Sequence, residues 1–151
     1  MAQASTLFKV SAKGKWESGV KTNISIRNFP AFSMDEPAEL GGADAAPTPL
    51  EYVVAALCGC NGVMIPLVAE ELGFTFSGID FETTGIIDTR GLMGEEGVCT
   101  HFQKVRFQVN IRTEESEERM EQLKKEVERR CPVLNLLLDA GIQVDTKWSK
   151  K

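Results

Sequence analysis

The chain has 151 residues, of which 42% are hydrophobic and 26% are charged. This length suffices for one domain that buries most of its apolar surface, and the composition excludes a disordered chain. The net charge of −5 gives no electrostatic reason to expect nucleic acid or an acidic membrane as a partner. We therefore expect a single globular domain over residues 1–151.

The first 15 residues contain no apolar core of the kind that a signal peptide needs. We therefore expect a cytoplasmic protein, in which thiols stay reduced unless they are catalytic or redox-sensing. Residues 52–69 carry no charge, which is near the lower limit for a membrane span. The residues that break this segment and the acidic residues that follow it favour a helix buried by protein, without a membrane span: Gly59, Asn61, Gly62, Pro66, Glu70 and Glu71.

Residues 20–27 alternate apolar or β-branched residues with polar ones, which predicts a half-buried strand. Residues 7–16 are expected to pair with it across a turn near Ser18–Gly19. Residues 29–49 are rich in glycine, proline and acidic residues, and they predict a short strand followed by a long ordered loop.

A helix is expected to begin at the end of this loop. Thr48 is a favourable N-cap, and Pro49 takes the first helical position, where its missing N–H costs nothing. Glu51 completes a capping box with Thr48. The helix is expected to end at Gly73, with a kink near Pro66.

The remaining segments show clear periodicities of either strands or amphipathic helices. The expected strands are 75–88, 101–113 and 142–148, and the expected helices are 116–130 and 131–141. One face of the second of these strands is expected to carry Val105, Phe107, Val109 and Ile111. The apolar stripe of the first of these helices is expected to consist of Met120, Leu123 and Val127. Strands, a buried helix, further strands and paired helices together predict an α+β domain.

Cys60 lies on the apolar stripe of the first helix, which we expect to consist of Val53, Leu57, Cys60, Met64 and Leu67. Cys58 is about 200° away around the helix, so these two thiols cannot form a disulfide within it. The same separation disfavours a metal site built on the pair. A small buried hydrophobic residue and a reactive thiol both remain open interpretations of Cys60.

Cys131 precedes Pro132 at the expected start of a helix and follows Arg129 and Arg130. A helix N-terminus and nearby cations stabilise a thiolate, so we expect a lowered pKa for Cys131. Its position continues the inward-facing stripe of the preceding helix, where a second thiol could meet it. Cys99 and His101 lie in a loop rich in glycine and glutamate, and we expect no metal site there.

Residues 35–60 (DEPAELGGADAAPTPLEYVVAALCGC) resemble a segment of the OsmC/Ohr family of osmotically inducible and organic hydroperoxide resistance proteins. Residues 129–137 (RRCPVLNLL) supply the second matching motif, with Cys131 placed 71 residues after Cys60. The resemblance implies an α+β OsmC-like fold, with an N-terminal hairpin, a central helix that carries Cys60, further antiparallel strands and two C-terminal helices. It also implies an intertwined homodimer with active sites at the subunit interface.

Characterised members of this family are thiol peroxidases that act on organic hydroperoxides. By resemblance, Cys60 is the peroxidatic cysteine, which becomes a sulfenic acid, and Cys131 resolves it to a disulfide. A dithiol, which is a lipoyl group in the family, then reduces the disulfide by exchange. No metal, flavin or haem is implied.

The chain departs from the family pattern at two positions. Leu50 follows the helix proline where the family has a glutamate. Glu51 is one residue later, about 100° around the helix, and it is open whether it serves only as the helix cap or also as the partner of the thiolate. Lys21 stands where the family has an arginine, and it keeps the charge without the bidentate fork.

An apolar pocket that would favour organic hydroperoxides is expected from Val53, Leu57, Met64, Phe29 and Phe32. Two alternatives stay open. One is a non-catalytic dimer that binds a small hydrophobic ligand or senses redox state. The other is a metal site at Cys58, Cys60 and Cys131.

Overall fold

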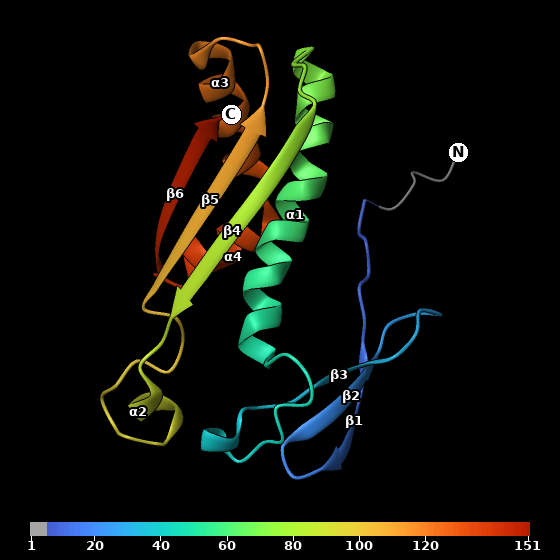
Figure 1. Ribbon diagram of the computed structural model, residues 1–151, viewed down its shortest axis with the longest axis vertical. Coiled ribbons are helices and arrows are strands. Elements are labelled where there is room, and N and C mark those ends of the chain that lie inside the picture. The colour runs from blue at the N-terminus through green and yellow to red at the C-terminus, as the bar shows by residue number, and fades with distance from the viewer. Residues whose placement is uncertain (1–5) are drawn as a thin grey trace. The chain divides into compact units, whose positions relative to one another are not determined.

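A computed structural model describes residues 6–151 of the chain (Figure 1). The chain forms two units, Met1–Tyr52 and Val53–Lys151, and each is described below by itself.

The first unit contains a three-stranded antiparallel sheet in the order β1-β2-β3. Its strands are β1 (Lys13–Ser18), β2 (Lys21–Ser25) and β3 (Phe32–Met34). Gly19 adopts a positive φ of 54° in the β1–β2 turn, a conformation that glycine takes without steric cost. The predicted hairpin, its turn near Ser18–Gly19 and the short third strand are therefore confirmed. The first strand was predicted over residues 7–16 but begins only at Lys13, so residues 7–12 lie outside it.

A buried carboxylate orders the loop that follows β3. Asp35 is 2% exposed and accepts hydrogen bonds from the backbone N–H groups of Ala43 at 3.2 Å and Ala45 at 3.1 Å. These backbone hydrogen bonds hold the pKa of Asp35 below its usual value, although burial acts in the opposite direction. A short 3-10 helix, η1 (Ala38–Leu40), lies within this loop.

Helix α1 (Pro49–Leu72) starts with the predicted capping box. The Thr48 N–H donates to Glu51 Oε2 at 2.7 Å, and the Glu51 N–H donates to Thr48 Oγ1 at 3.2 Å. The helix ends at Gly73, which has a positive φ of 61° as a C-terminal stop requires. Both predicted ends of this helix are confirmed.

The second unit contains a sheet in the order β4-β5-β6. Its strands are β4 (Gly78–Ile86), β5 (Lys104–Arg112) and β6 (Gln143–Lys150). β5 pairs antiparallel with β4 and parallel with β6, and the predicted alternation of buried residues along β5 is confirmed at Val105, Phe107, Val109 and Ile111. The connection between β4 and β5 contains a short helix, α2 (Thr89–Leu92), that the sequence did not indicate.

Two C-terminal helices complete this unit, α3 (Glu117–Arg130) and α4 (Pro132–Asp139), and Figure 1 shows α1 running along the β4-β5-β6 sheet. The predicted apolar stripe of α3, at Met120, Leu123 and Val127, is buried. The predicted α+β architecture is confirmed. The expected antiparallel pairing is wrong for β6, which runs parallel to β5 because α3 and α4 connect the two strands as a crossover.

The buried face of α1 differs from the predicted one. Val53 and Leu67 are 38% and 45% exposed, and Cys60 and Met64 are only half-buried. The residues that pack into the core are Leu57, Asn61, Ile65, Val68 and Ala69. The predicted stripe was wrong by about one residue, because a helix without charges from 52 to 69 offers no polar face that fixes its rotation.

The opposite face of α1 is apolar and exposed. It carries Gly59, Gly62, Val63, Pro66 and Leu67, and Val63 is 66% exposed. Among the described residues, α1 is the one helix long and apolar enough to cross a membrane by length and composition, a test that core helices also pass. Its packed face identifies α1 as a core helix of the second unit.

We expect Thr48→Ala to lower the free energy of unfolding by about 1 kcal/mol, because the substitution removes the N-cap acceptor. Glu51→Gln should leave stability nearly unchanged, because glutamine also completes a capping box. Thermal and denaturant unfolding of the two variants measures both effects. Equal losses for the two variants would contradict this account of the helix start.

Candidate active site

The structure brings together two cysteines that are 71 residues apart in the sequence. Cys60 lies in the middle of α1, and Cys131 occupies the N-cap position of α4. Cys131 Sγ donates a hydrogen bond to Cys60 Sγ across 3.3 Å, and both thiols are free. Because a disulfide bond is about 2.05 Å long, the sulfurs need to move about 1.3 Å closer to form one.

The two thiols differ in exposure. Cys131 is 0% exposed, whereas Cys60 is half-buried. Burial raises the pKa of the Cys131 thiol to about 11, although the N–H groups of Leu134 and Val133 at the start of α4 act to lower it. The predicted lowering of the Cys131 pKa is therefore wrong. The helix N-terminus does contribute, but the loss of hydration outweighs it.

The neighbouring arginines form ion pairs away from the thiol. Arg129 binds Glu126 at 2.7 Å, and Arg130 binds both carboxylate oxygens of Glu71. The two arginines, which were expected to stabilise the Cys131 thiolate, therefore bind carboxylates instead.

Asn61 is a member of the site that the sequence prediction missed. Its Nδ2 atom donates to Cys131 Sγ at 3.5 Å and to the Leu57 carbonyl at 3.0 Å. The side chain is fully buried. An asparagine directly after Cys60, in a segment otherwise free of strongly polar side chains, was the signal available in the sequence.

Lys21 and Glu51 both lie in the first unit, and both have partners there. Lys21 Nζ pairs with Glu17 Oε1 at 3.3 Å, and Glu51 serves the capping box. Leu50 provides no functional group at the position between Pro49 and Glu51. The catalytic roles that the resemblance implies for Lys21 and Glu51 stay predictions.

The residues of the expected apolar pocket have different environments. On α1, Leu57 is part of the packed core, Met64 is half-buried and Val53 is exposed. In the first unit, Phe32 packs against the ring of Tyr52 with the ring centroids 5.1 Å apart. Phe29 is exposed, and its ring lies beneath the guanidinium of Arg27. A shared pocket stays a prediction.

The other two thiols are separate from the pair. Cys58 Sγ lies 2.9 Å from Thr83 Oγ1 on β4, which confirms that Cys58 and Cys60 face different sides of α1. Cys99 is exposed, and its sulfur lies 3.5 Å from Nδ1 of His101. Within residues 6–151, no three His, Cys, Asp or Glu side chains are grouped closely enough to hold a metal ion.

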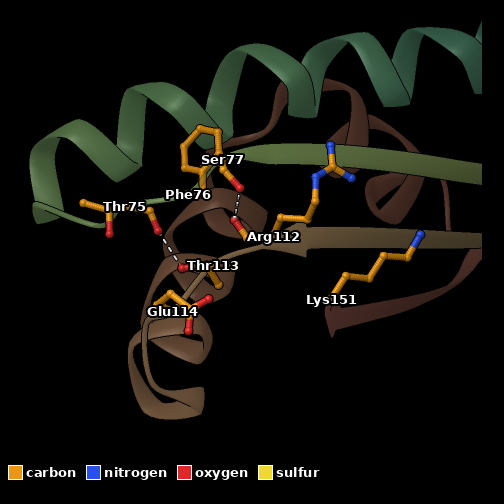
Figure 2. Close-up of a pocket in the computed structure, with 7 residues that line it drawn as sticks. All are labelled: Thr75, Phe76, Ser77, Arg112, Thr113, Glu114 and Lys151. Carbon is orange, nitrogen blue, oxygen red and sulfur yellow. Dashed lines mark hydrogen bonds between the residues drawn. The ribbon is translucent and has the colours of Figure 1, made fainter.

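A hollow of about 470 Å³ lies at one end of the second unit, and none of its lining residues is a cysteine (Figure 2). Arg112 and Lys151 supply its cationic groups, but both are near Asp80, with separations of 2.6 Å and 3.9 Å. These cations are already partnered, so the hollow offers little to an anionic ligand. The thiol pair is the better candidate for the site.

The raised pKa of Cys131 predicts a pH dependence of stability in the reduced protein. The folded state keeps this proton longer than the unfolded chain, so its stabilising effect is complete below pH 9 and is lost as the pH rises toward about 11. The loss should be on the order of 1–3 kcal/mol. Unfolding free energies of the wild type and Cys131→Ala, measured from pH 8 to about 11, isolate this contribution as a difference in slope. Parallel curves would contradict the burial account.

The profile of the OsmC-like protein family matches residues 41–147, which is more than half of the chain and includes both Cys60 and Cys131. No curated protein sequence matches the chain.

Solved structures show the same fold at low sequence identity. An OsmC-like protein from Mycoplasma pneumoniae has a TM-score of 0.81 and 17% identity, over 95% of this chain and 97% of the other. An organic hydroperoxide resistance protein from Elizabethkingia anophelis has a TM-score of 0.76 and 21% identity, with coverages of 97% and 99%. An organic hydroperoxide resistance protein OsmC from Legionella pneumophila has a TM-score of 0.72 and 20% identity, with the same coverages.

At these identities the structural matches establish the fold, and the family profile establishes the relationship. The chain belongs to the OsmC-like protein family.

Proposed function

We propose that the protein is a thiol-dependent peroxidase that reduces organic or lipid hydroperoxides in oxidative-stress defence. The single observation that carries this proposal is the 3.3 Å contact between the sulfurs of Cys60 and Cys131. Solved proteins of the same fold are named as organic hydroperoxide resistance proteins, which supports the choice of substrate class.

In the proposed reaction, the Cys60 thiolate attacks the O–O bond of a hydroperoxide, ROOH. The bond breaks, Cys60 becomes a sulfenic acid, and the alkoxide takes up a proton and leaves as ROH. Cys131 then attacks the Cys60 sulfur, and the hydroxyl group leaves as water with the Cys131 proton. A dithiol of the lipoyl type returns both cysteines to thiols and is itself oxidised to a disulfide.

The unequal environments of the two thiols support this order of events. Cys60 is the more exposed of the two thiols and accepts the hydrogen bond from Cys131, so it is the sulfur that a substrate reaches first. Cys131 is fully buried and keeps its proton at neutral pH, so it does not compete with Cys60 for the hydroperoxide, and it loses this proton only when it attacks the oxidised Cys60 sulfur.

The proposal extends to Lys21 and Glu51 as the groups that assist Cys60, and to the apolar residues Val53, Leu57, Met64, Phe29 and Phe32 as the substrate pocket. Glu51→Gln separates two roles of the glutamate, because it keeps the capping box and removes the charge. A loss of peroxidase rate in this variant at unchanged stability would support the catalytic role.

We also place the protein in the cytoplasm as a single domain that forms a homodimer. The exposed apolar face of α1 supports dimer formation, because a surface with Val63 and Leu67 exposed between small residues is best covered by protein. The family profile spans residues on both sides of Tyr52, which supports one domain.

The alternative is a non-catalytic dimer that binds a small hydrophobic ligand or senses redox state. It is favoured by one group of observations: Lys21 and Glu51 have other partners, and Leu50 offers no charge. The close thiol pair would then serve as a reversible redox switch.

The purified protein should consume cumene hydroperoxide when dihydrolipoamide is supplied as the reductant. Cys60→Ser should abolish this activity, because the attacking sulfur is lost. Cys131→Ser should turn over once and then accumulate sulfinic acid at Cys60, because the sulfenic acid has no resolving thiol. Hydroperoxide loss and the intact mass of each variant provide the measurements.

Cys99→Ser is the control, because its exposed thiol lies outside the pair and should leave the rate unchanged. The peroxidase proposal fails if the wild type consumes no hydroperoxide above the rate without protein while both thiols of the pair remain titratable. Redox sensing or ligand binding would then be the function to examine.

The wild type should have a mass in solution of twice the 16.6 kDa chain. Val63→Glu should shift it toward the monomer, because a charge on the exposed face of α1 cannot be buried in an interface without a large cost. Leu136→Glu is the matched control, since Leu136 is also an exposed apolar residue, on α4. Light scattering measures the mass in solution of the wild type and the two variants. A monomeric wild type would contradict the proposed dimer.

A further inference from the structure

Asn61 occupies a costly position on the buried face of α1. Its neighbours on that face are Leu57, Ile65 and Val68, all apolar and fully buried. Asparagine is a poor helix former, and a buried amide without its full set of partners destabilises a fold. Asn61 Oδ1 is buried and has no hydrogen-bond partner among the described residues. Stability alone therefore does not account for an asparagine at this position.

The hydrogen-bond donors of the amide are in use. The Nδ2 group has two hydrogens, and two acceptors are in range: the Leu57 carbonyl at 3.0 Å and Cys131 Sγ at 3.5 Å. The bond to a backbone carbonyl fixes which end of the amide carries the nitrogen. The second hydrogen is then directed at the sulfur of Cys131.

Asn61, Cys131 and Cys60 thus form a chain of two hydrogen bonds. Asn61 donates to Cys131 Sγ, and Cys131 donates its only hydrogen to Cys60 Sγ. An amide donor to the Cys131 sulfur favours the rotamer in which the S–H bond is directed at Cys60. It also stabilises negative charge on Cys131, which burial otherwise opposes.

We propose that Asn61 is a positioning residue for the disulfide steps, which its amide promotes by holding the Cys131 sulfur toward Cys60 and by stabilising that sulfur as a thiolate. The inference rests on the proposed function for its biological setting, but it concerns the exchange chemistry of the pair alone.

Cys131 carries negative charge twice in the cycle. During disulfide formation, the Cys131 thiolate attacks the Cys60 sulfur and displaces the group bound there. During reduction, a thiolate of the dithiol attacks the more accessible Cys60 sulfur, the S–S bond breaks, and Cys131 leaves as a thiolate that then takes a proton. A donor that stabilises this thiolate promotes its formation as nucleophile and its departure as leaving group.

Dithiobis(nitrobenzoate) tests this role without any hydroperoxide. The probe reacts first with half-exposed Cys60, which forms a mixed disulfide and releases one thionitrobenzoate. Cys131 then attacks the Cys60 sulfur, the mixed disulfide breaks, and a second thionitrobenzoate is released. The proton that Cys131 loses in this attack passes to the buffer. The experiment uses the full chain with Cys58→Ala and Cys99→Ser, so that all released thionitrobenzoate comes from the reactions of Cys60 and Cys131.

The second release should be about tenfold slower in Asn61→Leu, because a hydrogen bond to a charged sulfur is lost. Its pH profile should also move to higher pH by about one unit, since the Cys131 thiolate becomes harder to form. Asn61→Ala, which cannot clash with its surroundings, should show the same two changes. The rate of the first release depends on how easily the probe reaches Cys60. An unchanged first rate in the Asn61 variants therefore shows that access of the probe is the same as in the parent.

Ile65→Val is the matched control, because Ile65 lies one turn further along the same buried face. It should leave the second release unchanged at every pH. The thermal stability of Asn61→Leu should equal or exceed that of the parent, because the substitution removes an unpaired buried oxygen.

The inference is overturned if both Asn61 variants release the second thionitrobenzoate at the parental rate and with the parental pH profile. It is also overturned if the parent releases only one equivalent, since the pair then does not exchange. A failed peroxidase assay with slow second release in the Asn61 variants supports the inference and removes only the peroxidase proposal.

Discussion

The rotation of α1 about its own axis determines the chemistry of this protein. The helix packs through Leu57, Asn61 and Ile65, and this face directs Cys60 toward the start of α4 while Cys58 contacts Thr83 on β4. Each residue along a helix turns the side chain by about 100°, so burial of the predicted stripe would have placed Cys60 in the core. The observed rotation leaves its sulfur half-exposed and within 3.3 Å of Cys131.

Burial divides the two thiols into different chemical types. Cys131 has the start of α4 beside it, an arrangement that lowers the pKa of many reactive cysteines. Full burial outweighs that effect and keeps the proton on Cys131, so the donor of the sulfur pair is fixed. The S–H group of Cys131 therefore points at the sulfur of Cys60, and this is the geometry from which the proposed disulfide would form.

The sequence was sufficient wherever charges fixed the orientation of an element. The stripe of α3 was predicted because acidic and basic residues mark its solvent face, and the start of α1 was predicted from side chains that bond the nearby backbone. The buried face of α1 was not predicted correctly, because residues 52–69 carry no charge that would mark a solvent face. The raised pKa of Cys131 and the role of Asn61 arise from packing between segments 70 residues apart, which no local pattern contains.

The departures at Leu50 and Lys21 leave Cys60 without the two orienting side chains of the family pattern. In the family pattern, a glutamate and an arginine orient the attacking sulfur. In this chain the lysine and the nearest glutamate have other partners, whereas the hydrogen bonds from Cys131 and Asn61 converge on the sulfur pair. Orientation of Cys60 by the Cys131 thiol has a consequence for the proposed peroxidase reaction. In the proposed reaction, the group that positions Cys60 before oxidation is also the nucleophile that attacks it afterwards, so the sulfenic acid would form with Cys131 already in contact. Such a site favours rapid disulfide formation over further oxidation of Cys60.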